Sequence, residues 1–191
     1  FRHSEAGVCR GLARGIEAGG ASSVEPSIGA GHVVVSHDHH GPRGSVTPRH
    51  WAYFDTSVLA KRYVKEAGSS ATRRLLQRFR FLSSAVTPVE VMSALSRRRA
   101  AGELTPKDFL AIRARLVKDR AYWELVEVGE DVLRQAEELV QKTDVRTLDA
   151  LHIASAMMFQ AASGLTIPFI TSDAKQRDAA QAMALTVIWV E

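Results

Sequence analysis

The chain has 191 residues, of which 46% are hydrophobic and 24% are charged, a composition typical of globular proteins rather than of disordered or fibrous ones. Its net charge of +4 is compatible with a polyanionic partner. The single cysteine, Cys9, excludes an internal disulfide framework, and because no apolar run reaches bilayer length we expect a cytoplasmic protein without a membrane segment.

The first fifty residues differ in composition from the rest of the chain. They contain nine of the thirteen glycines and six of the seven histidines, and few apolar side chains that could offset the entropy cost of ordering the backbone. We expect residues 1–50 to be a disordered leader, or residues 1–45 to be upstream translation before a start at Val46. The run His37-Asp38-His39-His40 lacks a rigid frame, so we expect no metal site there.

Residues 51–191 alternate between short apolar runs and helical patterns. Aromatic and β-branched runs predict strands at residues 51–55, 81–86, 123–128, 167–171 and 186–190. Helical spacing, with Thr-Pro starts and glycine ends, predicts helices at residues 58–64, 70–80, 87–102, from 105 onward, 131–142, 147–163 and 173–183. This alternation predicts an α/β fold whose central, mostly parallel sheet has about five strands and is covered on both faces.

Four carboxylates fall at junctions between these elements. Asp55 ends the first predicted strand, and Asp173 directly follows the fourth. Glu90 and Asp149 each lie in the first turn of a predicted helix. The carboxyl ends of parallel strands share one edge of a sheet, where ligands bind. We therefore expect the four acids to converge at that edge, provided that the helix carrying Asp149 begins there.

Each acid also has a local structural explanation. Glu90 lies three residues after Thr87, which is the spacing of a capping box. Asp149 would stabilise the positive end of a helix dipole, and Asp55 and Asp173 would suit a turn or a helix cap. Four converging carboxylates would nevertheless repel one another, which a protein tolerates where a divalent cation neutralises them. Oxygen ligands favour Mg²⁺, or Mn²⁺, over zinc.

Four segments resemble the signature segments of a known family. Over residues 51–191 the chain is similar to PIN domain ribonucleases, in particular to the VapC-type toxins of type II toxin–antitoxin systems. The segments that carry the resemblance are YFDTSVLAKRYVKE, TPVEVMSAL, TLDALHIASA and FITSDAKQRDAA. The resemblance implies a PIN-like, three-layer α/β/α nuclease domain and Mg²⁺-dependent hydrolysis of RNA phosphodiesters to a 5′-phosphate and a 3′-hydroxyl.

The resemblance also assigns roles to individual residues. It implies that Asp55, Glu90, Asp149 and Asp173 form the acidic metal site. Among them we expect Asp55 and Asp149 to bind the metal directly and Asp173 to bind it directly or through water, while Glu90 orients or deprotonates the attacking water. It gives a supporting role to the hydroxyl groups of Ser57, Thr171 and Ser172, although Ser57 would also suit a helix N-cap. It further implies an RNA substrate, an antitoxin that covers the acidic site, and a homodimer.

Other side chains leave two interpretations open. His152 lies on an apolar helix face, and we interpret it as a core histidine rather than a metal ligand. The arginines between residues 73 and 120 suit either a solvated face or an RNA-binding groove. The apolar side chains of the first two helices face either a partner helix or the protein's own sheet. These are Val58, Leu59, Tyr63, Val64, Leu75 and Leu76.

Three alternative functions follow from the same residues. The first is a PIN nuclease of RNA processing that is not a toxin. The second is a catalytically silent PIN module that binds RNA or protein, although the presence of all four acids argues against it. The third is a phosphohydrolase with an aspartate nucleophile, which usually has a second aspartate two residues later; Ser57 stands at that position.

Overall fold

A sheet of five parallel strands forms the centre of the computed structural model, which describes residues 49–191. The strand order is β3-β2-β1-β4-β5, so β1 lies in the middle. The strands are β1 (Trp51–Phe54), β2 (Arg80–Ser84), β3 (Glu124–Val126), β4 (Phe169–Thr171) and β5 (Val187–Trp189). The predicted parallel sheet is confirmed, and each strand except β1 and β2 is shorter than predicted by two or more residues.

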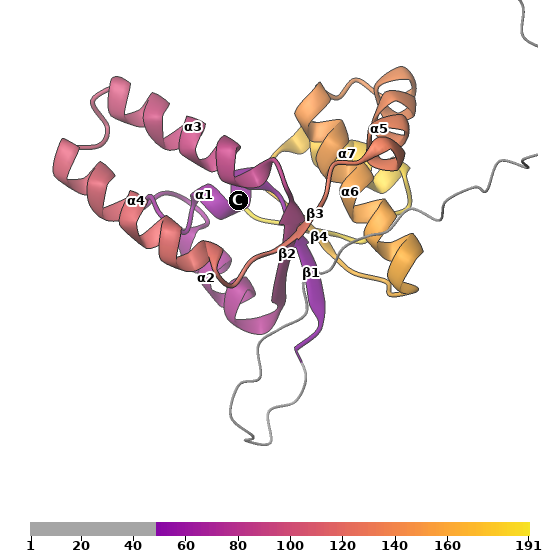
Figure 1. The fold of residues 1–191 in the computed structure, drawn as a ribbon, viewed down its shortest axis with the longest axis horizontal. Helices are drawn as coiled ribbons and strands as arrows, with labels where there is room; N and C mark the ends of the chain where they lie inside the picture. The colour runs from indigo at the N-terminus through magenta and orange to yellow at the C-terminus, as the bar shows by residue number, and fades with distance from the viewer. Residues whose placement is uncertain (1–48) are drawn as a thin grey trace, which may run out of the picture. The chain divides into compact units, whose positions relative to one another are not determined.

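Seven helices cover the two faces of this sheet within the described residues. They are α1 (Thr56–Ala60), α2 (Ser69–Arg78), α3 (Thr87–Ala100), α4 (Pro106–Arg120), α5 (Glu130–Lys142), α6 (Thr147–Ser163) and α7 (Ala174–Ala182). Helices α1–α4 lie on one side of the strands and α5–α7 on the other (Figure 1). The expected three-layer α/β/α arrangement is therefore confirmed.

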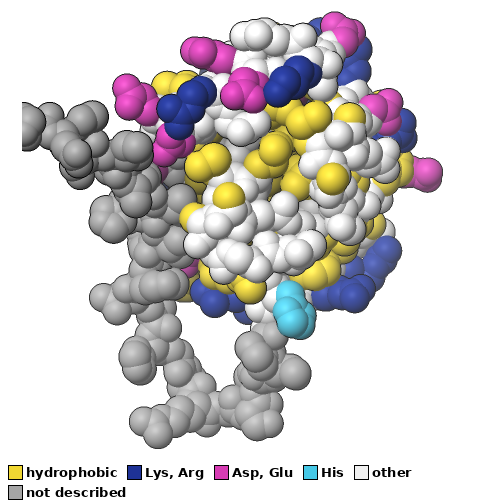
Figure 2. Space-filling view, turned by 90° about the vertical axis from the view of Figure 1, so that its right-hand side faces the viewer, with side chains coloured by type: hydrophobic (Ala, Val, Ile, Leu, Met, Phe, Trp, Pro, Cys, Tyr) yellow, Lys and Arg dark blue, Asp and Glu magenta, His cyan; other side chains and the backbone are white. Residues whose placement is uncertain are grey.

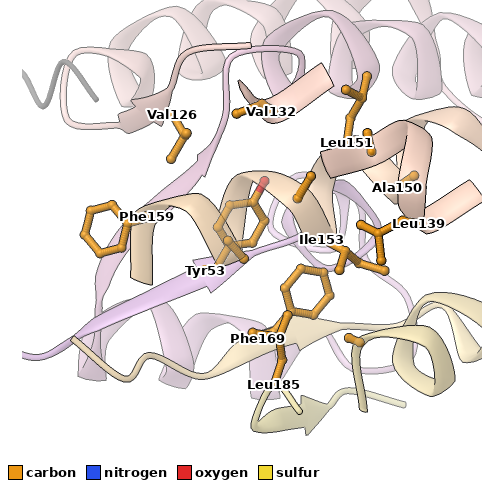
Figure 3. Packing of buried hydrophobic residues seen from close by; sticks show 14 of the residues in the cluster. Tyr53, Val126, Val132, Leu139, Ala150, Leu151, Ile153, Phe159, Phe169 and Leu185 are labelled. Atoms are coloured by element: carbon orange, nitrogen blue, oxygen red, sulfur yellow. The ribbon is translucent and has the colours of Figure 1, made fainter. Parts of the chain in front are cut away.

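Strand β1 shows how the sequence builds two cores at once. Its residues Ala52, Tyr53 and Phe54 are fully buried, because successive side chains of a strand point to opposite faces. Tyr53 packs into the cluster under α5–α7, where its ring stacks on Phe169 at 5.3 Å (Figure 3). Ala52 and Phe54 join the cluster on the α2 side. The central strand is thus held on both faces.

Helix α6 is the longest described helix and has the predicted bounds. It buries eight residues, which explains why its sequence is apolar on almost every side. It ends at Gly164, whose φ of +68° is the left-handed C-cap conformation that favours glycine. Its first turn carries Asp149, and His152 follows one turn later. The docking of this helix therefore decides where both side chains lie.

The region after β1 differs from the prediction. Helix α1 ends at Ala60, and turns replace the rest of the predicted helix through Val64. Val58, Leu59 and Tyr63 are buried in the protein's own core. The remaining members of that apolar set, Val64, Leu75 and Leu76, are partly buried and pack against the same core clusters. The intramolecular interpretation is therefore correct for Val58, Leu59 and Tyr63.

The outer face of α5–α7 carries scattered apolar side chains among charged ones (Figure 2). Leu133 and Val140 of α5 are each 45% exposed there. No helix within residues 49–191 is both long and apolar enough to cross a membrane. The expectations for residues 1–50 fall almost entirely outside the described part of the chain, which begins at residue 49. The histidine run at residues 37–40 lies outside it as well.

Candidate active site at the carboxyl edge of the sheet

The candidate site begins where β1 and β4 end side by side. Phe54 pairs with Ile170 in the parallel register, and the Asp55 amide donates a hydrogen bond to the Ile170 carbonyl oxygen at 2.9 Å. Asp55 therefore lies next to Thr171. The chain continues from β1 to β2 on one side of β1, whereas β4 lies on the other side, so this is the point where the strand order reverses. Open α/β sheets bind ligands at such a point.

Asp55 is held by hydrogen bonds to both of its carboxylate oxygens. Its Oδ2 accepts from the backbone amide of Ser57 at 3.0 Å and from the Ser57 hydroxyl at 2.5 Å. Its Oδ1 accepts from the Gln176 side-chain amide at 3.1 Å. Asp55 is the N-cap of α1 and is only 4% exposed. The carboxylate is thus both a local cap and a preorganised group, while Ser57 does not serve as the cap.

The three predicted supporting hydroxyls all lie around Asp55. The Ser57 hydroxyl accepts from the Ser172 backbone amide at 2.9 Å. The Thr171 hydroxyl lies 2.7 Å from Gln176 Oε1 and 3.3 Å from Asp55 Oδ2. The Ser172 hydroxyl is buried and has no hydrogen-bond partner among the described residues. A buried polar group without a partner is unusual, so it points to a water or ligand beside the two strand ends.

Glu90 does not form the capping box that its spacing allows. The N-cap of α3 is Val86, which makes no side-chain cap, and the Thr87 hydroxyl instead lies 2.6 Å from the Ser83 hydroxyl. Glu90 Oε2 accepts from the Thr56 hydroxyl at 2.8 Å and lies 2.6 Å from His152 Nε2. The side chain of Glu90 therefore turns toward α1 and α6, beside Asp55.

His152 is a buried histidine, as predicted, yet both of its ring nitrogens bond to polar groups. Nδ1 lies 2.9 Å from the Tyr53 hydroxyl, and Nε2 lies 3.7 Å from Asp55 Oδ1. Burial alone would lower the pKa of His152. The hydrogen bond to Glu90 and the charges of Asp55, Glu90 and Asp149 outweigh burial, so the pKa is raised above its ordinary value. His152 therefore links the core to the acidic site.

Asp149 and Asp173 complete the acidic edge. Asp149 lies in the first turn of α6, where it accepts a hydrogen bond from the Arg146 backbone amide at 3.3 Å. Burial, and then the negative charges of Asp173 and Asp55, raise the pKa of Asp149 above its ordinary value. Asp173 is the N-cap of α7 and accepts from the Gln176 backbone amide at 3.0 Å. As predicted, Asp149 lies at the positive end of a helix and Asp173 is a helix cap. The two carboxylates also repel each other.

The donor chemistry of this edge fits a hard divalent cation. Carboxylate and hydroxyl oxygens are the ligands that Mg²⁺ prefers, and a cation would relieve the repulsion that raises the pKa of Asp149. The unpartnered Ser172 hydroxyl lies at the same edge. Within residues 49–191, however, no three acidic, histidine or cysteine side chains already form a cage around one point. The carboxylates would have to rotate inward on binding.

Two residues of the site were absent from the sequence prediction. Gln176 is fully buried and bridges Asp55 and Thr171, and the Thr56 hydroxyl donates to Glu90. The signal for Gln176 was its position three residues after Asp173, the spacing of a first-turn cap partner. No local signal marks Thr56, because its partner lies 34 residues away in the chain.

A hollow of about 490 Å³ adjoins the acidic edge. Ser57 and Ser172 line its inner end, and Lys61, Arg97 and Arg98 line its wall. Arg98 pairs with Glu66 and Glu103, and Lys61 lies near Glu66. The Arg97 guanidinium donates to the Ser93 hydroxyl at 2.7 Å and forms no ion pair with any described residue. Arg97 is thus the cation of this wall that is free to meet an anionic ligand.

Comparison with known proteins gives the family of the chain. The PIN domain family matches residues 52–182. Ribonuclease VapC46 of Mycobacterium tuberculosis is 36% identical over 137 residues, which cover 71% of this chain and 95% of that protein.

Solved structures of low sequence identity share the fold. FitAcB from Neisseria gonorrhoeae superposes with a TM-score of 0.56 at 15% identity, covering 72% of this chain and 96% of that one. VapBC2 from Rickettsia felis, bound to a DNA fragment from its promoter, gives 0.53 at 12% identity and covers 73% and 98%. The sequence match and the shared fold agree, and the chain belongs to the PIN domain family, among its VapC-type members.

Proposed function

We propose that the protein is a Mg²⁺-dependent endoribonuclease, with Mn²⁺ as a possible substitute. The observation that carries the proposal is that Asp55, Asp149 and Asp173 lie at one edge with Glu90 beside them. Burial, and then the charges of Asp173 and Asp55, raise the pKa of Asp149 there. The relative that is 36% identical is named a ribonuclease, which supports the same activity here.

The acids and the hydroxyl residues of the site have different proposed roles in hydrolysis. Asp55, Asp149 and Asp173 would hold the cation, and Ser57, Thr171 and Ser172 keep Asp55 and the end of β4 in place. When bound, Mg²⁺ would neutralise charge on the scissile phosphate and make a nearby water more acidic.

Glu90 is the proposed acceptor of the proton from the attacking water. The water oxygen attacks phosphorus and the bond from phosphorus to the 3′ oxygen breaks. The 3′ oxygen then takes up a proton, which leaves a 5′-phosphate and a 3′-hydroxyl.

The hollow beside Ser57 and Ser172 is the proposed path of the RNA backbone. It leads away from the acidic edge along α3, and Arg97 on its wall forms no ion pair with a described carboxylate. A phosphate one or more nucleotides from the cleavage site would meet a positive charge there, which offsets the repulsion from the acids. Arg97 would therefore contribute to binding rather than to the chemical step.

The test is cleavage of a fluorophore–quencher single-stranded RNA by the purified chain. We expect activity with Mg²⁺ or Mn²⁺, none with EDTA, and recovery when Mg²⁺ is added back in excess, because the clustered acids need a cation to approach a phosphate. Mass spectrometry of the products should find 5′-phosphate ends. Cleavage that persists unchanged in EDTA would refute the proposed metal dependence.

A variant outside the acids provides the control for this assay. Arg97→Ala should raise KM for RNA while leaving kcat within about twofold of the wild-type value, because loss of one phosphate contact weakens ground-state and transition-state binding alike. The dependence of KM on salt should also become shallower by about one charge. An Arg97→Ala protein whose KM and salt dependence match those of the wild type would remove Arg97 from the RNA path.

We further propose that the protein is the toxin of a toxin–antitoxin pair. The support is its membership of the VapC-type PIN domains; VapC20 of Mycobacterium tuberculosis, which is named a toxin that cleaves the sarcin–ricin loop, shares the fold at 19% identity and a TM-score of 0.51, covering 67% of this chain and 94% of that one. That the protein acts as a homodimer is a proposal from the family resemblance alone. Two alternatives within the family are a nuclease of RNA processing and a silent binding module.

Induced expression separates these three functions. A toxin should stop growth when expressed alone, should be neutralised by the product of a neighbouring gene, and should co-elute with that product in size-exclusion chromatography. The Asp149→Asn protein is the matched control and should not stop growth. A chain that cleaves RNA without arresting growth would favour the processing nuclease, and one that does neither would favour the silent module.

A further inference from the structure

His152 is buried at the junction between the hydrophobic core and the acidic edge. It is 1% exposed, and its two nitrogens contact groups from two other elements, Tyr53 of β1 and Glu90 of α3. We propose that His152 is a positioning residue that orients Glu90 to take the proton from the attacking water. The proposal rests on the ribonuclease function argued above, and extends it to a residue that does not itself touch the substrate.

The chemistry of the two groups fixes which nitrogen carries a proton. An ionised carboxylate oxygen can only accept a hydrogen bond. With Glu90 as the carboxylate that accepts the proton of the attacking water, the 2.6 Å contact between His152 Nε2 and Glu90 Oε2 requires a hydrogen on Nε2. This holds for the neutral ring and for the charged ring alike. The direction of the bond is thus independent of the charge state of His152.

A second donor reaches the same oxygen of Glu90. The Thr56 hydroxyl donates to Oε2 at 2.8 Å and lies 3.2 Å from His152 Nε2, so the three groups form a closed triangle. No described residue donates to Oε1 of Glu90. With Oε2 held by two donors, Oε1 is the oxygen that remains available to a water molecule. The triangle therefore decides which of the two carboxylate oxygens faces the reaction.

The other side of the ring is anchored in the core. Tyr53 is fully buried and stacks on Phe169 (Figure 3). Its hydroxyl lies 2.9 Å from His152 Nδ1. Burial raises the pKa of Tyr53 above its ordinary value, which favours the protonated hydroxyl. The imidazole is therefore oriented from the core side by a fully buried group.

Two amide side chains separate the two hydrogen bonds of His152. In His152→Gln the longer side chain places its amide nitrogen near the position of Nε2, where it can still donate to Glu90. In His152→Asn the amide lies near the position of Nδ1, where it can still bond to Tyr53 but does not reach Glu90. Both variants remove the ring and leave a polar group in the same cavity. Asparagine is one methylene shorter than glutamine, so His152→Asn leaves the larger cavity.

The proposal predicts different kinetics for the pair. His152→Asn should lower kcat about tenfold to a hundredfold with KM for RNA within about twofold, the loss typical of removing a group that orients a reactive residue. His152→Gln should keep most of the activity. Thermal unfolding should show the smaller His152→Asn side chain to be the less stable of the two, and kcat is therefore compared at a temperature where both variants are folded. Equal losses of kcat in the two variants would overturn the role in positioning Glu90.

A double-mutant cycle tests whether the effect acts through Glu90. In a Glu90→Gln background the proton acceptor is already gone, so adding His152→Asn should lower kcat no further. A full additional tenfold loss would mean that His152 acts on something other than Glu90, and would overturn the proposal.

A spectroscopic readout tests the geometry without relying on activity. Long-range ¹H–¹⁵N correlation in the metal-free protein should find Nε2 of His152 protonated, and the chemical shift of that proton should change in Glu90→Gln. A ring without a proton on Nε2 would overturn the proposed orientation. If the wild-type protein cleaves no RNA, the proposed ribonuclease function fails and the kinetic role of His152 fails with it, whereas the protonation of Nε2 is decided separately by this measurement.

Discussion

An Asp149→Asn protein is expected to cleave RNA at least about a hundredfold more slowly than the wild type, the scale of loss seen when one charge-stabilising group is removed from an active site. The change keeps the shape of the side chain and an oxygen that can still accept from the Arg146 amide. It removes one of the three negative charges proposed to hold the cation. Single-turnover cleavage at saturating Mg²⁺ measures the effect.

The same variant should be more stable than the wild type when no metal is present. The pKa of Asp149 is raised in the folded protein, by burial and then by Asp173 and Asp55. A carboxyl group with a raised pKa binds its proton more tightly when folded, so its ionisation destabilises the fold as pH rises through that pKa. The melting temperature in EDTA should therefore be higher for Asp149→Asn at pH 7. The gain should vanish below about pH 3.8, the ordinary value, where the wild-type group is protonated in both states.

Mg²⁺ should reverse this order of stability. A ligand that binds only the folded state stabilises it in proportion to its affinity, so added Mg²⁺ should raise the melting temperature of the wild type more than that of Asp149→Asn. The control is Asp144→Asn, which makes the same substitution at an exposed residue whose pKa is lowered by Lys175. That control should show neither the gain in EDTA nor the loss of cleavage. A wild-type melting temperature that Mg²⁺ leaves unchanged would argue against a cation at this edge.

Asp55→Asn is the second change with a large expected effect, and its effect on stability differs from that at Asp149. Cleavage should again fall at least about a hundredfold. Stability should fall as well, by about 1–3 kcal/mol, because a buried donor would be left without an acceptor. The asparagine amide group would face either Gln176 Nε2 or the Ser57 amide, and both of these are donors.

Urea denaturation in EDTA distinguishes the two contributions at Asp55. If relief of charge repulsion dominated, Asp55→Asn would be as stable as the wild type or more stable. Because Asp55 is only 4% exposed and accepts these hydrogen bonds, we expect Asp55→Asn to be less stable than the wild type. The comparison with Asp149→Asn is direct, because both variants remove one carboxylate from the same edge. A more stable Asp55→Asn protein would show that repulsion outweighs these hydrogen bonds.

Much of the fold was predictable from local patterns. The aromatic run of β1 and the apolar helix from Thr147 to Ser163 follow from side-chain periodicity and from a glycine end signal. Thr105 caps α4 ahead of Pro106 as its sequence predicts, with its hydroxyl accepting from the Asp108 amide at 3.1 Å. These features depend on neighbours within a few residues, which is why one sequence was enough to locate them.

Local patterns were a poorer guide where two interactions competed for one side chain. Thr87 and Glu90 have the spacing of a capping box, yet Thr87 bonds to Ser83 and Glu90 to His152. The apolar residues after β1 suited a partner helix, and the protein's own core buries them. In both cases the interaction that forms is between different secondary-structure elements. For Thr87 and Glu90 it provides a hydrogen-bond partner for a polar group away from solvent, and for the apolar residues it buries area that would otherwise be exposed.

The sequence by itself determined the α/β class, the parallel order of elements and the placement of Asp55, Glu90 and Asp173 toward one edge, because these depend on periodicity and on the direction of parallel strands. The position of Asp149 depended on the docking of α6. Only the tertiary structure decided what surrounds these acids. Gln176 meets Asp55 across 121 residues and His152 meets Glu90 across 62. The docking of α6 and α7 against the sheet brings these residues into contact. Such docking is the sum of many small packing terms, none of which is visible in any short segment.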